Sequence, residues 1–184
     1  WVPGPGEGLF NAIIDRVGSN PILAEDLGEA SKDAAVLRKT YGIPGMKILQ
    51  MSFGNGTPFK SMSENTVVYT GTHDNDTCIG WYFSENGDGT TQSNKEILKE
   101  RIHAKNVLKL NDIDVNWRMV EYSMKSNANT AIFPMQDILG MDSSARMNTP
   151  GTIGGNWEWR YNQTHLNDGI KHRLKKLTKE TQRI

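Results

Sequence analysis

The chain has 184 residues, of which 36% are hydrophobic and 23% charged, a composition typical of a globular protein with a sizeable core. Its 21 basic and 21 acidic residues give zero net charge, so the charge indicates neither a nucleic-acid partner nor an anionic membrane surface, and no segment approaches the roughly 18 apolar residues of a membrane span. The single cysteine, Cys78, excludes a disulfide framework and a cysteine-based zinc site, and it fits a reducing, cytoplasmic location.

The first part of the chain predicts two alternations of helix and strand. Residues 6–18 carry apolar side chains at helical spacing. An apolar run of strand length follows at residues 21–26. Residues 29–42 contain good helix formers and end on Gly42, a common residue at the end of a helix. A second strand is predicted at residues 46–50, which makes this region a β-α-β unit.

The rest of the chain predicts two more strands and three helices. The strands are the apolar runs at residues 66–74 and 131–137. Between them, residues 94–110 and 114–127 have the apolar spacing of amphipathic helices. Residues 167–184 carry apolar positions at helical spacing among basic residues, which predicts a terminal helix docked on the core.

The four apolar runs indicate how the strands are arranged. Each is hydrophobic through its middle rather than alternating, as in parallel strands buried on both faces. Four β-α units fit either an open doubly wound sheet or part of a β/α barrel. No glycine-rich phosphate loop follows any strand, and the strands end in polar residues, as barrel strands do at an active site. These are Glu25 with Asp26, Gln50, His73 with Asp74, and Gln136 with Asp137.

We therefore predict an α/β fold that is the C-terminal half of a (β/α)8 TIM barrel. A complete barrel takes roughly 250 residues, and the chain begins at Trp1 without an initiator methionine. We expect the N-terminal half of the barrel to lie outside this chain. Residues 1–184 then form the C-terminal part of one catalytic barrel, with a helical insertion at about 84–128 in the crossover before the last strand.

Glu25 and Asp74, at the ends of the first and third predicted strands, indicate glycoside chemistry. A glycosidic oxygen must be protonated as its bond breaks, while a second carboxylate supports the positive sugar ring. Partial desolvation behind residues 21–24 would suit Glu25 to the role of acid. Asp26 is expected to orient or cap the following helix. One alternative stays open, that Glu25 is only a helix N-terminal acid. From the residues alone, Asp74 would be the nucleophile, because a retaining mechanism needs a pair of carboxylates.

The motif THDND, residues 72–76, has two other interpretations. A zinc site needs three or four ligands with recognisable spacing, and no second histidine cluster is present. A calcium loop of the EF-hand type, counted from Asp74, would need glycine at the sixth position, where the chain has Ile79. We therefore predict no metal and no cofactor. An acidic turn remains the simplest alternative, and Asn75 and Asp76 are expected to shape it.

Five segments together carry a resemblance to a known family. They are WVPGPGEGLF, PILAEDLG, YGIPGMKILQMSF, VVYTGTHDNDTCIGW and FPMQDILGMDSSARMNTPGTIGGNWEWR. In this order they resemble glycoside hydrolase family 77, the 4-α-glucanotransferases, also called amylomaltases or disproportionating enzymes. The resemblance implies a β/α barrel of the α-amylase superfamily. It also implies transfer of α-1,4-glucan segments with retention, through a covalent glycosyl-enzyme intermediate.

The resemblance assigns roles to matching residues. Glu25 corresponds to the general acid/base, Asp74 to the transition-state stabiliser, and His73 to a residue that contacts the sugar. Asn156 and Trp157 lie in a segment close to the cleft, so they are expected to line sugar subsites. The alternative is that Trp157 and Trp159 pack the last helix on the barrel. The family's nucleophilic aspartate has no counterpart here and should precede the chain.

These assignments predict a 4-α-glucanotransferase whose partners are α-1,4-glucans and maltooligosaccharides, with no nucleic acid and no membrane. The isolated chain, without the nucleophile, is expected to be inactive. One alternative is an α-glucosidase of the same superfamily, in which water accepts the intermediate. Another is a carbohydrate-binding fragment without catalysis. The sequence predicts no particular oligomeric state.

Overall fold

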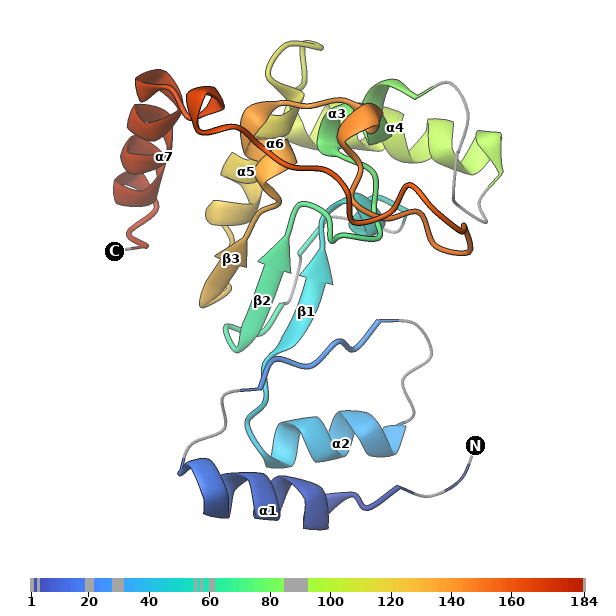
Figure 1. Ribbon diagram of the computed structural model, residues 1–184, viewed down its shortest axis with the longest axis vertical. Helices are drawn as coiled ribbons and strands as arrows, with labels where there is room; N and C mark the ends of the chain where they lie inside the picture. The colour runs from blue at the N-terminus through green and yellow to red at the C-terminus, as the bar shows by residue number, and fades with distance from the viewer. Residues whose placement is uncertain are drawn as a thin grey trace.

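A three-stranded parallel sheet lies at the centre of the fold (Figure 1). The computed structural model describes residues 2, 4–18, 22–27, 32–54, 56, 58–59, 62–84 and 93–183. The strands β1 (Gly45–Ile48), β2 (Thr66–Tyr69) and β3 (Thr130–Ile132) lie side by side in chain order. Val67 and Val68 of the central strand are 1% and 0% exposed, so both faces of β2 are covered. The prediction of parallel strands buried on both faces is confirmed for β2.

The first predicted strand, at residues 21–26, is wrong as a strand. Residue 21 lies outside the described residues, and residues 22–27 form no ladder with β1. The Ala24 N–H donates to the Pro44 carbonyl at 3.0 Å, but the next donor, Met46 N–H, bonds to the Asp26 side chain at 2.8 Å. The Asp26 carboxylate thus accepts from the Met46 N–H, which in a continuous sheet would donate to a backbone carbonyl of residues 22–27. The strand pairing that starts at Ala24 therefore does not continue.

The last strand is shorter than predicted. β3 ends at Ile132, and the helix α6 (Met135–Leu139) begins directly after Pro134. Proline cannot donate to a sheet ladder, but it is well tolerated at the start of a helix. Gln136 and Asp137 were expected at an open strand end, and instead they are buried in this helix. Gln50 likewise is buried, in the 3-10 turn Gln50–Ser52 that follows β1.

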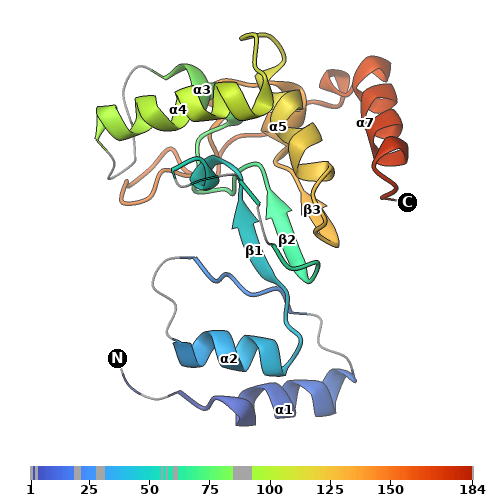
Figure 2. The ribbon, with the colours of Figure 1, turned by 180° about the vertical axis from the view of Figure 1, so that it is seen from behind.

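The crossover from β2 to β3 is helical, as predicted. It contains α3 (Cys78–Phe83), α4 (Asn94–Leu108) and α5 (Val115–Met124). A capping box between Ser93 and Glu96 starts α4, since each residue satisfies a backbone N–H of the other. The helices α3 and α4 lie at the carboxyl end of the sheet in both Figure 1 and Figure 2.

Helix α5 connects the two main hydrophobic clusters. Met119 packs in one cluster with residues that follow β1 and with α3 and α4. Val120 packs in the other cluster with α6 and α7 (Asp168–Glu180). The terminal helix predicted over residues 167–184 is confirmed as α7, and Leu177 is its buried contact. Arg183 then donates to the carbonyls of Met124, Ser126 and Ala128, which ties the end of the chain to the end of α5.

Helices α1 (Glu7–Val17) and α2 (Lys32–Thr40) lie together beyond the amino ends of the strands (Figures 1 and 2). Tyr41 joins them, because its ring packs 5.1 Å from Phe10 and its hydroxyl donates to Asn11 Oδ1 at 2.8 Å. Neither helix has a buried residue. Across the described ranges, no helix combines the length and the apolar character needed to cross a membrane.

Candidate active site

A cleft of about 490 Å³ runs over one face of the sheet and reaches the loops that follow the strands. Met46, Val67 and Tyr69 line its sheet side. Three of the predicted site residues also line it, namely Glu25, His73 and Trp157. They come from three distant parts of the chain, so the tertiary structure assembles the cleft that the strand-end pattern predicted.

The loop after β2, residues 70–77, is folded by its own side chains. The Asn75 carboxamide oxygen accepts from the Thr72 N–H and the Thr72 hydroxyl, both at 2.9 Å. Asp76 accepts from the Thr77 N–H at 2.7 Å and from the Ser143 hydroxyl at 2.6 Å. Its carbonyl accepts from Gln50 Nε2 at 2.8 Å. The prediction that Asn75 and Asp76 shape this turn is confirmed.

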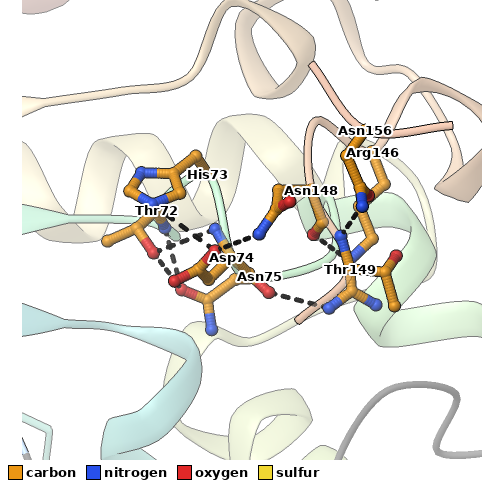
Figure 3. A network of polar contacts seen from close by, with 8 residues as sticks. All are labelled: Thr72, His73, Asp74, Asn75, Arg146, Asn148, Thr149 and Asn156. Carbon is orange, nitrogen blue, oxygen red and sulfur yellow. Dashed lines mark hydrogen bonds and ion pairs between the residues drawn. The ribbon is translucent and has the colours of Figure 1, made fainter. Parts of the chain in front are cut away.

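Residues 146–149 hold the tip of this loop (Figure 3). Asn148 Nδ2 donates to Asp74 Oδ1 at 2.5 Å, and the Asn148 N–H donates to the His73 carbonyl at 3.1 Å. The Arg146 guanidinium donates to the Asp74 carbonyl at 2.7 Å. His73 Nε2 lies 3.4 Å from the same Asp74 oxygen. Asp74 keeps half of its side chain exposed, so its carboxylate is oriented by donors on one side and remains accessible.

His73 and Trp157 form an aromatic pair at the cleft. Their ring centroids lie 4.9 Å apart, and Trp157 is 53% exposed. Trp157 has a positive φ of 64°, a conformation that costs a non-glycine residue about 1 kcal/mol. Trp159 also lines the cleft. Both tryptophans are thus placed where sugar rings could stack on them.

Asn156, like Asp74, is not among the residues that line the cleft. Its carboxamide oxygen accepts from the Thr149 N–H at 2.9 Å, and its Nδ2 donates to Thr152 Oγ1 at 3.0 Å. Both bonds close the loop of residues 149–156. Asn156 therefore shapes the segment that presents Trp157, and its polar atoms are used within that segment.

Glu25 lies on the extended segment 22–27, where its side chain is exposed at the edge of the cleft. Residues 22–27 are described and contain no helical turn, so Glu25 does not lie in the first turn of a helix, and the helix-terminal alternative is wrong. Asp26 was expected to orient or cap the following helix; it accepts from the Met46 N–H of β1 and lies 3.3 Å from Arg38 Nε of α2, so it holds this segment to both elements.

The structure adds Arg146 and Asn148, which the strand-end pattern did not single out, and it places Asp137, named there as a polar strand end, in a buried position. Arg146 and Asn148 hold the loop that carries Asp74, although more than seventy residues separate them in sequence. Asp137, at 1% exposure, bonds to both ends of that loop. All three lie in the longest of the five family-like segments, residues 133–160. Membership of this segment was the one feature of the sequence that could have indicated Arg146 and Asn148. Within the described residues, no three His, Cys, Asp or Glu side chains converge as metal ligands.

Comparison with known proteins decides the family. The family model described as 4-alpha-glucanotransferase, glycoside hydrolase family 77, matches residues 1–165. The chain belongs to the 4-alpha-glucanotransferase family. The resemblance in the five segments is therefore confirmed.

Relatives within the 4-alpha-glucanotransferase family agree. The chloroplastic/amyloplastic 4-alpha-glucanotransferase of Arabidopsis thaliana is 45% identical over 164 residues, which are 87% of this chain and 27% of the relative. The 4-alpha-glucanotransferase of Thermus thermophilus is 38% identical over 190 residues, covering 100% of this chain and 37% of the relative. The chain thus spans about a third of the length of these curated relatives.

A solved structure gives the same result for the fold. The amylomaltase from Streptococcus agalactiae, in complex with acarbose, superposes with a TM-score of 0.84 at 33% identity. The match covers 100% of this chain and 36% of that one. The parallel strands and helical crossovers of this 4-alpha-glucanotransferase family member are therefore part of a (β/α)8 barrel.

Proposed function

We propose that the whole protein is a 4-α-glucanotransferase that transfers α-1,4-glucan segments between maltooligosaccharides with retention. Glu25, His73 and Trp157 line one cleft beside the oriented carboxylate of Asp74, and this arrangement is the observation that carries the proposal. Family membership supports it. So does the related amylomaltase, which was solved with the carbohydrate acarbose bound.

In this mechanism Glu25 protonates the glycosidic oxygen as the bond to the departing glucan breaks. Asp74 stabilises the oxocarbenium-like transition state with its negative charge. The nucleophile is an aspartate from the part of the barrel outside this chain, and it forms the covalent glycosyl-enzyme. Glu25, now ionised, then takes the proton from the acceptor hydroxyl, whose oxygen displaces the aspartate and restores the α configuration.

His73 and Trp157 are proposed to bind the sugar ring next to the bond that breaks. The indole offers an apolar face to the C–H groups of a pyranose ring, while the imidazole can hydrogen-bond to its hydroxyls. Trp159 would bind a neighbouring ring in the same way, since it lines the same cleft. The site would thus recognise a chain of glucose units rather than a single sugar.

The reaction products test this proposal against an α-glucosidase. A transferase passes the intermediate to a sugar hydroxyl, so the whole protein incubated with maltotriose should produce glucose and a ladder of longer glucans. Chromatography of the products at several times would follow this ladder. Glucose and maltose without longer products would contradict the proposal and favour hydrolysis.

The isolated chain of residues 1–184 is proposed to be inactive, because a retaining reaction requires the nucleophile. Maltotriose incubated with this chain alone should remain unchanged, and any longer glucan would contradict the assignment. A cytoplasmic location is also proposed, since the single cysteine, Cys78, is a buried free thiol.

A further inference from the structure

One buried carboxylate joins the two ends of the loop that carries His73 and Asp74. Asp137, in α6, is 1% exposed. The Thr70 hydroxyl donates to its Oδ2 at 2.5 Å, and the Cys78 N–H donates to its Oδ1 at 2.7 Å. Thr70 is the first residue of the loop 70–77, and Cys78 immediately follows the loop. A single side chain therefore fixes both the entry and the exit of the loop.

Asp137 is itself held by buried neighbours in α5, α6 and the turn at Ala145. Its carbonyl accepts from Asn116 Nδ2 of α5 at 2.7 Å. The preceding residue, Gln136, donates to the Ala145 carbonyl at 3.1 Å. The following residue, Ile138, packs into the cluster formed by α5, α6 and α7. The two bonds to the loop thus originate from a rigid support, which is what a precisely positioned site requires.

A carboxylate is a costly residue for this position if packing is its only purpose. Burial raises the pKa of Asp137, and the nearby Asp76 charge raises it further, while the bonds from Cys78 and Thr70 lower it. An apolar side chain of similar volume would fill the space without this cost. It would, however, leave the Thr70 hydroxyl and the Cys78 N–H without their acceptor. The carboxylate is the group that connects these two donors.

We propose that Asp137 is a positioning residue for sugar transfer, which fastens Thr70 and Cys78 and thereby holds Asp74 at the reacting ring. This inference rests on the proposed function. Although Asp137 is part of the cleft wall, both of its oxygens accept hydrogen bonds from the loop ends and its side chain is buried. It therefore acts through the loop. Asn148 holds the tip of the same loop from the opposite, exposed side.

The test compares three variants of the whole protein. Asp137→Ala removes both bonds, so kcat for maltotriose disproportionation should fall about tenfold to a hundredfold, as expected when a catalytic group is misplaced by about 1 Å. KM should change less than kcat, because Asp74 acts mainly in the transition state. Asp137→Asn should restore kcat to within about threefold of the parent protein, since its oxygen can accept from Cys78 and its NH₂ can donate to Thr70.

Ile138→Val is the matched control. It truncates a buried side chain of the same helix without touching the loop, so kcat should stay unchanged. Hydrogen exchange of the amides of residues 71–78 gives a readout that does not depend on activity. These amides should exchange about tenfold faster in Asp137→Ala, the factor that corresponds to a loss of 1.4 kcal/mol in local stability, and at the parent rate in Ile138→Val.

The outcomes separate this inference from the proposed function. If the parent protein transfers glucan and Asp137→Ala does so equally well, the inference is wrong and the function stands. If the parent protein shows no glucan transfer, the proposed function fails. In that case the hydrogen exchange of residues 71–78 still tests the loop, and an unchanged exchange rate in Asp137→Ala would show that Asp137 does not hold it. If Asp137→Ala does not fold, Thr70→Val replaces it, because it removes one of the two bonds. Unchanged kcat and exchange in that variant would also overturn the inference.

Discussion

The two carboxylates of the site have opposite surroundings. The loop with Asp74 is bonded to residues from four other places in the chain, namely Gln50, Asp137, Ser143 and the pair Arg146 and Asn148. The segment with Glu25 is bonded, among the contacts described, only to residues 38–46. A transition-state stabiliser works through fixed geometry, whereas an acid/base must reach two oxygens in turn. The Glu25 segment lies outside β1, the edge strand of this part of the barrel, so its described bonds run to one side only.

The largest expected effect tests Glu25. In the whole protein, Glu25→Gln should lower kcat with maltotriose about a hundredfold to ten-thousandfold, the contribution typical of a general acid/base. A maltosyl donor with a fluoride leaving group needs no protonation, so this donor should restore formation of the intermediate. Burst kinetics with the fluoride would measure this step. An equally slow first step with both donors would remove Glu25 from the role of acid.

Asp74→Asn should have the next largest effect, with kcat lowered about a hundredfold to a thousandfold, because a preorganised charge is lost at the transition state. Here the fluoride donor should not restore the rate, since the oxocarbenium-like charge develops with any leaving group. Asp33→Asn on the exposed first turn of α2 makes the same chemical change away from the cleft and should leave kcat unchanged. If the maltosyl fluoride donor restored the rate of Asp74→Asn, the proposed difference in role between Asp74 and Glu25 would be wrong.

Asp26 tests how the Glu25 segment is held. Asp26→Ala leaves the Met46 N–H and the Arg38 guanidinium without this acceptor, so the protein should lose about 1–3 kcal/mol of stability. Gly45→Ala should act in the same direction, because a Cβ at this position would collide with the Asp26 carboxylate and the Arg38 guanidinium. Urea unfolding of the whole protein would measure both. Unchanged stability in both variants would show that other contacts hold the segment.

The smallest expected effect is a pH dependence from Asp137. Burial raises its pKa above the ordinary value of 3.8, although its two hydrogen bonds offset part of this shift. The folded state therefore holds the proton more tightly than the unfolded chain. Stability from this group is fully present below the unfolded pKa and is lost as the pH rises through the folded pKa.

Asp137→Asn cannot ionise, so it provides the reference for this pH dependence. The urea midpoint of the parent protein should fall relative to that of the variant as the pH rises from about 3 to about 7. Asp76, which contributes to the shift, is present in both proteins. A constant difference across this range would show that the carboxyl group has the same pKa in the folded and unfolded states.

Local patterns in the sequence determined much of the fold. The period of the apolar residues placed α1, α2, α4, α5 and α7, and the continuous apolar runs placed β1 and β2. Polar residues at the predicted strand ends indicated a site there, and Glu25 and His73 line the cleft, whereas Trp157 was indicated only by the family resemblance. The five family-like segments indicated the family. These features depend on neighbours within a few residues, or on motifs that the chain carries intact, so they are readable without the tertiary structure.

The tertiary structure alone decided which polar groups meet. Asp26 accepts a hydrogen bond from the Met46 N–H, so the sheet does not extend from β1 into residues 22–27. Pro134 ends β3 and starts α6, which places Asp137 in the core. Asn148 reaches Asp74 across 74 positions, and Asp137 reaches Thr70 across 67. Hydrogen bonds act over about 3 Å in space whatever the distance along the chain. The sequence by itself therefore supplied the site's residue types, and the fold decided which of them hold the others in place.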